Sequence, residues 1–329
     1  MDLQTKALYN LLRMNHLSDS STPCEAWQVE DLRQVSLDIL WSRMAKIGLQ
    51  LPRENLRHFA EECDSPEELA ELLLPDLEDP RQHDEAYLVI FEMWRRLFPE
   101  RQCLSIFCDE LDHCISLYYA GELDSDEPIQ NVLGNLDEVL SENVDAGVKP
   151  ALIFEKISSY CAHDIMAFII DFISNLLDSK NQLYASELIE DFAAYAPSLI
   201  WFDFLRARLA ALTDPIEANR IVNELLKYDE KLTVDLLLEI LRFQIGYGER
   251  PVFLATVKKI IARLQTDGDF QILLELAQDY FRRRDRDDLE AAIQQLLIKR
   301  QNLNGEIHSS DPDLRAFEKL VYASDSAAG

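Results

Sequence analysis

Apolar residues recur every three or four positions through nearly the whole chain, and no segment keeps the strict alternation of a half-buried strand. Between residues 84 and 98 the apolar positions lie one helical turn apart, and Pro99 ends the pattern. The pattern predicts an all-α protein of about 16 helices. Only 9 of the 329 residues are glycine, which agrees with this prediction because tight hairpins and phosphate-binding loops need more glycine.

Helix start signals recur along the chain. In Ser65-Pro66-Glu67-Glu68 a hydroxyl precedes a proline at the first helical position, and a glutamate follows that can bond back to the chain. Asp214-Pro215 and Asp311-Pro312 follow the same logic, because an aspartate accepts hydrogen bonds from the free N–H groups of a first turn. These signals predict helices that begin at three defined points.

Two segments give further expectations. From about Trp27 to Ile47 the apolar residues share one face, which predicts a single helix over this stretch. From 165 to 177 the chain is apolar nearly all round, with one narrow polar stripe. This segment is shorter than the ~20 residues that cross a bilayer, so we expect a buried helix at the centre of the second half.

Breaks in the pattern predict the domain organisation. Residues 121–128 are acidic, lack apolar periodicity and end in proline, which predicts a joint. Before it we expect an acidic helical subdomain over 1–120, and after it a helical-repeat domain over 129–302. Residues 303–329 are predicted to form a polar tail with one short helix near 311–322.

The second half contains an internal repeat of helical hairpins. Each second helix opens on a small residue with an aliphatic residue four positions later, at spacings of 33, 38 and 36 residues. The four pairs are Ala185 and Ile189, Ala218 and Val222, Thr256 and Ile260, and Ala292 and Leu296. A small residue at this point allows two helices to approach closely.

On these residues the stretch 165–301 resembles degenerate tetratricopeptide-type (TPR-like) repeats, most closely at 217–226 and 274–297. The tryptophan and the glycine–tyrosine pair of that family's first helix are absent, so the resemblance is to the architecture. It implies antiparallel helical hairpins in an irregular right-handed solenoid, whose concave face binds peptide segments or partner helices. The resemblance does not extend to residues 1–120.

The charge narrows the range of partners. The chain has 32 basic and 60 acidic residues, a formal net charge of −28, and residues 1–150 hold 12 of the basic and 31 of the acidic ones. A polyanion repels phosphate backbones and anionic lipid, so we expect neither nucleic-acid nor membrane binding. Residues 242–300 differ, with 11 basic and 9 acidic residues. They form either a solvated helical face or a docking patch for an acidic partner or for the acidic N-terminal half of the same chain. An RNA-binding helical repeat is a weaker alternative, because acids interrupt the patch and the whole molecule repels phosphate.

Few residues of the chain have the spacing of a known catalytic or metal-binding site. Glu110 and His113 have the spacing of a di-iron ligand pair, but no second Glu-x-x-His occurs. His163-Asp164 matches the His-Asp dipeptide of metal-dependent phosphohydrolases, with His113 and Asp203 as further ligands. This gives an alternative hypothesis, a metal-dependent hydrolase. We otherwise expect no enzyme, and no catalytic, cofactor or metal residues.

The cysteines indicate the compartment. None of the six has Cys-x-x-Cys spacing, and Cys103, Cys108, His113 and Cys114 lack the spacing of a zinc knuckle. The first residues lack the pattern of a secretory signal. We therefore expect reduced cysteines in a cytoplasmic protein. A bacterial effector secreted by another route is a further alternative.

The leading hypothesis is a non-catalytic protein–protein interaction module: an adaptor, a chaperone-like factor or a regulatory scaffold. The first helices of the hairpins are predicted at about 165–178, 199–212, 234–246 and 270–283, and the resemblance implies that they line the binding face. The long polar side chains nearest the expected inner stripe are Arg206, Arg242, Gln278 and Arg282. Arginine suits planar contacts at interfaces, so we expect a partner segment that is acidic or ends in a carboxylate.

Overall fold

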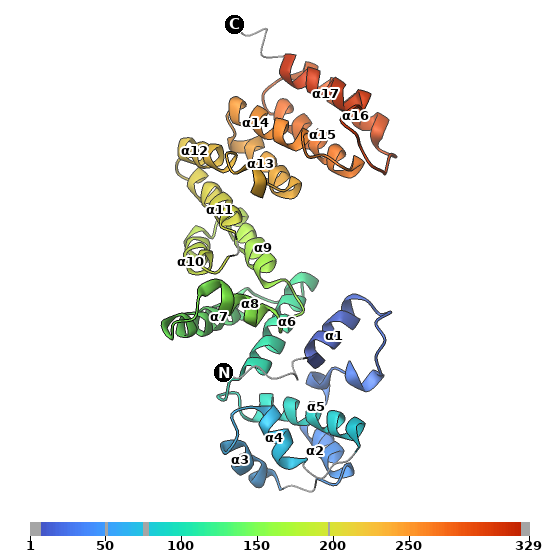
Figure 1. Cartoon of the computed structure of the whole chain (residues 1–329), viewed down its shortest axis with the longest axis vertical. Coiled ribbons are helices and arrows are strands. Elements are labelled where there is room, and N and C mark those ends of the chain that lie inside the picture. The colour runs from blue at the N-terminus through green and yellow to red at the C-terminus, as the bar shows by residue number, and fades with distance from the viewer. Residues whose placement is uncertain (1–7, 50–51, 75–78, 197, 324–329) are drawn as a thin grey trace. The chain divides into compact units, whose positions relative to one another are not determined.

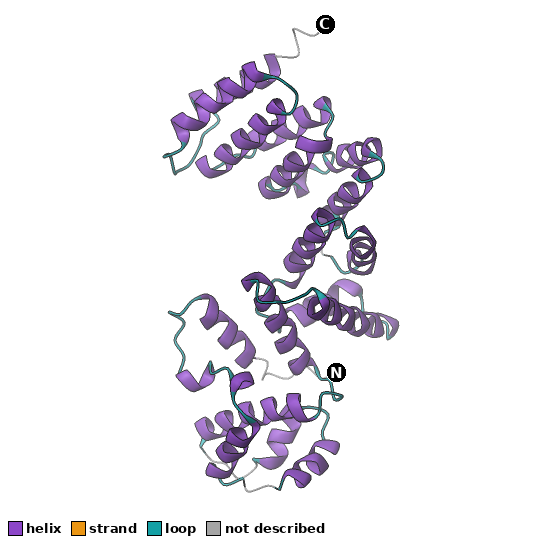
Figure 2. Cartoon of the chain, turned by 180° about the vertical axis from the view of Figure 1, so that it is seen from behind, coloured by secondary structure: helices purple, strands orange, loops and turns teal. Residues whose placement is uncertain are grey.

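The computed structural model describes residues 8–49, 52–74, 79–196 and 198–323. Within these ranges the chain forms 17 α-helices, with 73% helix and no strand (Figures 1 and 2). The all-α prediction is confirmed. The first residues, on which the prediction about secretion rests, and residues 324–329 of the predicted tail lie outside the described residues.

The chain divides into two compact units, residues 1–168 and 169–329. The first unit contains two 3₁₀ turns, η2 (Ala26–Gln28) and η3 (Leu32–Gln34), and eight complete helices. These helices are α1 (Leu8–Ser18), α2 (Leu37–Lys46), α3 (Arg53–Glu61), α4 (Pro66–Leu73), α5 (Pro80–Leu97), α6 (Leu104–Ala120), α7 (Glu127–Asp145) and α8 (Pro150–Ser158). The predicted joint lies inside this unit, as a loop between α6 and α7 that is exposed except at Leu123. Gly121 ends α6 at a φ of 68°, a conformation that glycine adopts readily.

The core of the first unit lies between α2, α3, α4 and α5. Trp94 and Tyr87 of α5 are among its largest fully buried side chains. The indole N–H of Trp94 donates to the carbonyl of Arg101 at 3.0 Å, so its one polar atom is satisfied. The capping signal at Ser65 works as predicted, since its hydroxyl accepts from the Glu68 N–H at 3.3 Å and Glu68 accepts from the Asp64 N–H.

The prediction of one helix from Trp27 to Ile47 is wrong. The structure has the two short turns η2 and η3 here, and a regular helix starts only at Leu37. Val35 and Ser36 are extended, with ψ values of 130° and 148°. Apolar residues of this stretch do face one core, but they come from a short turn and a helix and not from one continuous helix.

The physical cause is Arg96 of α5. Its guanidinium donates to the carbonyls of Leu32 at 2.6 Å, Arg33 at 2.7 Å and Val35 at 2.8 Å. A continuous helix would use these carbonyls for the N–H groups four residues on. The side chain of Glu92 holds the same guanidinium in place. Arg96 thereby stabilises the broken conformation.

Helix α9 (Ile165–Asp178) begins at the end of the first unit. The second unit contains a 3₁₀ turn, η4 (Asp229–Lys231), and eight complete helices. They are α10 (Gln182–Ala193), α11 (Ile200–Ala211), α12 (Pro215–Leu225), α13 (Val234–Tyr247), α14 (Arg250–Ile261), α15 (Asp267–Arg282), α16 (Asp287–Arg300) and α17 (Pro312–Ala323). The predicted helix at 165–178 is present, and Phe168, Ile169, Phe172 and Ile173 in it are fully buried.

Neighbouring helices of the second unit pack in pairs. Helix α11 packs on α12, α13 on α14 and α15 on α16, while α11, α13 and α15 also contact one another in that order. The side chains of Ala218 and Thr256, the small residues predicted at two of these crossings, are fully buried. Asp214 caps α12 as predicted, with bonds from the N–H groups of Ile216 and Glu217 at 3.0 and 3.1 Å.

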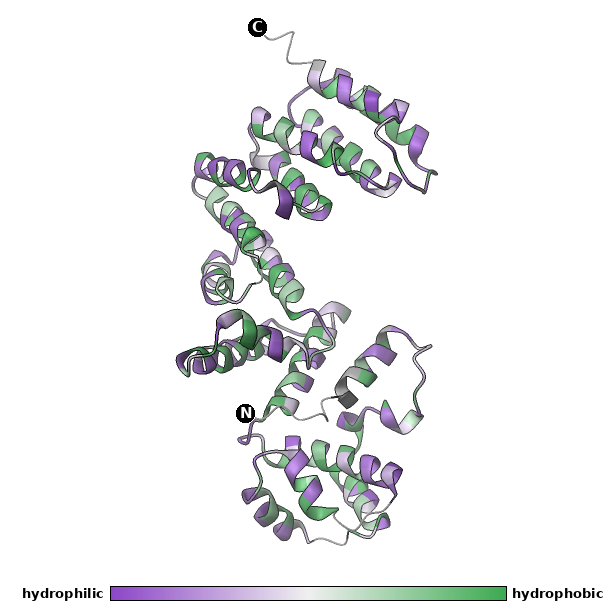
Figure 3. Cartoon of the chain, viewed as in Figure 1, coloured by the Kyte–Doolittle hydropathy of each residue, from purple (hydrophilic) through white to green (hydrophobic). Residues whose placement is uncertain are grey.

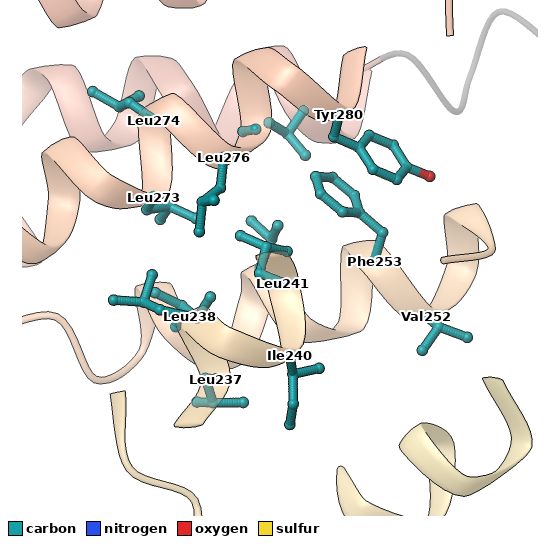
Figure 4. Close-up of a cluster of buried hydrophobic side chains, with 14 of the residues drawn as sticks. Leu237, Leu238, Ile240, Leu241, Val252, Phe253, Leu273, Leu274, Leu276 and Tyr280 are labelled. Atoms are coloured by element: carbon teal, nitrogen blue, oxygen red, sulfur yellow. The ribbon is translucent and has the colours of Figure 1, made fainter. Parts of the chain in front are cut away.

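One apolar cluster joins α11 to α17. Figure 4 shows its middle, where leucines of α13 face leucines of α15 and the ring of Phe253 lies against that of Tyr280. The centroids of these two rings are 3.5 Å apart. Along the helices hydrophobic and hydrophilic residues alternate by turn (Figure 3), as expected of helices that bury one face.

The predicted tail helix is present as α17, but it is part of the core. Leu314, Phe317 and Val321 are buried, and α17 packs on α14 and α16. At its start the guanidinium of Arg300 is surrounded by three carboxylates, those of Asp267, Asp311 and Asp313. The second unit therefore continues well beyond residue 302.

Candidate functional site

The predicted partner-binding residues lie on three alternate helices of the second unit. Arg206 is on α11 and Arg242 on α13, while Gln278 and Arg282 are both on α15. Since α11, α13 and α15 contact one another in order, they form one continuous layer. The structure thus brings the helices that bear these residues together.

Each arginine is paired with an acid one turn earlier on its own helix. The contacts are Asp203 to Arg206 at 2.7 Å, Glu239 to Arg242 at 3.3 Å and Asp279 to Arg282 at 2.5 Å. We call these six residues the acid–arginine stripe. The arginine side chains are 40%, 58% and 56% exposed. The stripe carries three positive and three negative charges, so its sum is zero.

These pairs bind their arginines weakly. An exposed ion pair at this helical spacing stabilises by about 0.3–0.5 kcal/mol, because water screens both charges. The contact occupies one nitrogen of the guanidinium, Nη1 in Arg206 and Nη2 in Arg282. A guanidinium has five N–H donors, so each arginine can keep its own acid and still bind another carboxylate.

Gln278 differs from the three arginines. Its amide nitrogen donates to Oε1 of Gln294 on α16 at 2.5 Å. The residue therefore ties a first helix to its second helix. Both amides are uncharged, so we expect Gln278 to contribute less to binding than the arginines.

The basic run after α15 is partly used inside the second unit. Arg284 donates to the carbonyl of Gly248 at 2.7 Å, and its guanidinium carbon lies 3.6 Å from the ring centroid of Tyr280. Arg286 pairs with Asp288 at 3.0 Å. Since Arg284 fastens α15 to the end of α13, the charge of this run is not all available for docking.

In the first unit, His163 is bound by a carboxylate that the sequence did not indicate. Asp112 of α6 is 0% exposed and accepts from Nδ1 of His163 at 2.8 Å. The same carboxylate accepts from the backbone N–H groups of Ala162 and His163 at 2.8 and 3.0 Å. Asp112 is 51 residues away in sequence, and no spacing pattern could have paired the two. Asp164, the neighbour in the predicted dipeptide, instead accepts from the N–H of Ala167.

The other nitrogen of His163 faces a hydroxyl. Nε2 lies 3.5 Å from Oγ of Ser116, which completes the order of an acid, a histidine and a serine. Acyl transfer also needs N–H donors for the developing oxyanion. Ser116 lies within α6, where the helix commits the backbone N–H groups to its own hydrogen bonds. The bonds from Asp112 hold the segment before α9 against α6.

The residues of the predicted di-iron pair and zinc set have other surroundings. Cys103 and Cys108 are buried, and burial raises the pKa of the Cys103 and Cys114 thiols. All six cysteines are free thiols. Among the described residues, no group of three or more histidine, cysteine, aspartate or glutamate side chains is placed to hold a metal ion.

His113 makes the stability of the first unit depend on pH. Burial, together with the charges of Arg33 and Arg13, lowers the pKa of His113 from 6.5 to about 4. Between these values the unfolded chain takes up a proton that the folded chain refuses, so stability falls as the pH drops. We expect a smaller loss of unfolding free energy between pH 7 and pH 5 in His113→Gln, measured by urea denaturation. His58→Gln, at an exposed site, should lose as much as the parent. Equal losses of unfolding free energy in the parent, His113→Gln and His58→Gln would contradict the assignment of this pH dependence to His113.

Among the described residues no helix combines the length and the apolar character needed to span a bilayer. Comparison with known proteins adds no relative, since no protein-family model, no curated protein and no solved structure matches this chain.

Proposed function

We propose that this protein is a non-catalytic protein–protein interaction module, an adaptor or scaffold of the cytoplasm. Its partner binds along α11, α13 and α15, and the second unit works as a TPR-like array of helical hairpins. The acid–arginine stripe is the binding face, and the partner segment is acidic or ends in a carboxylate.

The observation that carries this proposal is the repetition of one exposed feature on helices that contact one another. An acid and an arginine at the same spacing occur on α11, α13 and α15. The helices of each hairpin bury their apolar residues against one another, so the exposed positions are free to serve binding. The pairing of α11 with α12, α13 with α14 and α15 with α16 supports the hairpin arrangement.

The chemistry of the stripe supports a carboxylate-bearing partner. Arginine binds a carboxylate through two parallel N–H donors, and exposed arginines lose little on leaving a weak helix pair. The acids of the stripe remain beside the arginines. A segment whose acidic residues are spaced to meet the arginine positions is therefore favoured over a uniformly acidic one.

The test starts with capture of a partner from native lysate, its identification by mass spectrometry and its purification. We expect Arg206→Glu combined with Arg242→Glu to weaken binding of the purified partner at least tenfold, because two attractive contacts become repulsive. Affinity of the unmutated protein should also fall as salt rises.

The matched control is Arg220→Glu on α12 combined with Lys227→Glu in the turn directly after it. These two cations also pair with acids three residues earlier, Glu217 and Glu224, and are exposed. The charge change is identical, but the two positions lie on a second helix and in the turn after it, outside α11, α13 and α15. If affinity falls equally in both double variants, the change in net charge alone explains the loss. Unchanged affinity in Arg206→Glu/Arg242→Glu, with an unchanged melting curve, would exclude the stripe as the binding face.

A further inference from the structure

A cavity of about 270 Å³ lies in the first unit, apart from the acid–arginine stripe. It is bordered by α2, α5 and the two 3₁₀ turns and opens to solvent. Its lining includes Trp27, Glu30, Leu32, Lys46, Ile47 and Glu85. The volume is slightly below the ~300–1,000 Å³ of pockets for drug-sized ligands, so it suits a smaller group.

Two helix faces build the cavity in the same way. From each helix, residues at positions i, i+3 and i+4 line the cavity. On α5 these are Glu85 and the apolar Leu88 and Val89. On α2 they are the charged Arg43 and Lys46, followed by Ile47 directly after the end of the helix. The cavity therefore has an apolar interior and a charged rim.

The interior is fixed by packing and one aromatic wall. Ala86 and Val89 are buried, and Leu32, Ile47 and Leu88 pack on the core of this unit. The indole N–H of Trp27 donates to Oε2 of Glu25 at 2.9 Å, which sets the orientation of the ring. Such a wall accepts an aliphatic or aromatic side chain.

The rim offers both signs of charge. Glu30 and Arg43 share two hydrogen bonds of 2.7 Å, and this pairing lowers the pKa of Glu30. Arg81 binds Oε1 of Glu85 at 2.9 Å, so Oε2 of Glu85 remains for a ligand. Lys46 is exposed and makes no ion pair within the described part of the chain. One carboxylate oxygen and one ammonium group are thus available.

We propose that this cavity binds a free α-amino acid with an apolar side chain. The side chain enters the interior beside Trp27, Lys46 binds the α-carboxylate and Glu85 binds the α-ammonium group. A zwitterion fits because the charges of the four charged lining residues, Glu30, Arg43, Lys46 and Glu85, sum to zero, so that a ligand with a net charge leaves one of these charges unmatched. This proposal is independent of the function assigned to the second unit.

The test is a titration of the full chain with L-leucine and L-phenylalanine, followed by calorimetry and by the shifts of backbone amide resonances. We expect saturable binding with shifts at the residues that line the cavity. Glycine, which lacks the side chain, and N-acetyl-L-leucinamide and N-acetyl-L-phenylalaninamide, which lack both charges, should bind at least tenfold more weakly.

Two variants locate the site. Lys46→Met should weaken binding of the amino acid at least tenfold without changing the melting temperature, because Lys46 is exposed. Lys149→Met, at an exposed lysine elsewhere in the first unit, should bind as the parent does. Absence of saturable binding at millimolar ligand would overturn the proposal. So would equal affinity for an amino acid and its neutral derivative, or unchanged binding in Lys46→Met.

Discussion

Replacing Arg300 with methionine should lower the free energy of unfolding by about 3–5 kcal/mol, because it leaves the buried carboxylate of Asp267 without its counter-charge, while Asp313 keeps Lys299. Arg300 is 4% exposed and donates to Asp311 at 3.0 Å and Asp313 at 3.1 Å, and also to Asp267. Methionine keeps an apolar stem, so that the effect reports on the charge. Chemical denaturation of the full chain measures it.

The control for this variant is Arg220→Met, which breaks an exposed pair with Glu217 and should change stability by less than about 0.5 kcal/mol. Adding Asp267→Asn to Arg300→Met should restore part of the loss, because the uncompensated charge is then removed. A loss in Arg300→Met no larger than that in Arg220→Met would show that the network is open to water.

Phe168→Asp should abolish the cooperative melt or make the protein insoluble. Phe168 is 1% exposed, and its ring meets those of Tyr118 and Tyr119 edge-on, with centroids 5.6 and 5.9 Å apart. Truncating a buried phenylalanine costs about 3–5 kcal/mol, and an isolated carboxylate in its place adds a desolvation penalty. Expression level, solubility and the thermal melt measure the outcome.

Ala167→Asp is the matched control, since it places the same carboxylate one residue earlier at an exposed position of α9. An acid in the first turn of a helix is tolerated or mildly stabilising, so this variant should melt within a few degrees of the parent. If Phe168→Asp also melted there, the buried position of the ring would be wrong.

The helices could be predicted because their causes are local. Apolar spacing and capping residues act over a few positions, so the predicted helix at 165–178 agrees with α9 and the signal at Asp214 agrees with the start of α12. The same reasoning failed at 27–47. There the deciding group is Arg96, more than 60 residues away, whose bonds to Leu32 and Arg33 outweigh the local preference for a helix.

The candidate sites also differ in whether local sequence reveals them. Arg206, Arg242 and Arg282 could be selected from the helical period, and the acids beside them are visible in the sequence at the same spacing. The bond between Asp112 and His163 joins two segments whose proximity depends on the whole packing of the first unit. The predicted polar tail shows the same limit. Its helix was evident, but the burial of Phe317 depends on α14 and α16.

The sharing of Arg300 among three aspartates has a consequence for how this sequence can change over time. The four residues come from the start of α15, the end of α16 and the start of α17, and they form one electrostatic unit. Because their contributions are not additive, a substitution at one position alters which residues the others tolerate. Loss of the arginine is neutral only where the aspartates are lost with it. In related sequences these four positions should therefore change together or stay unchanged together.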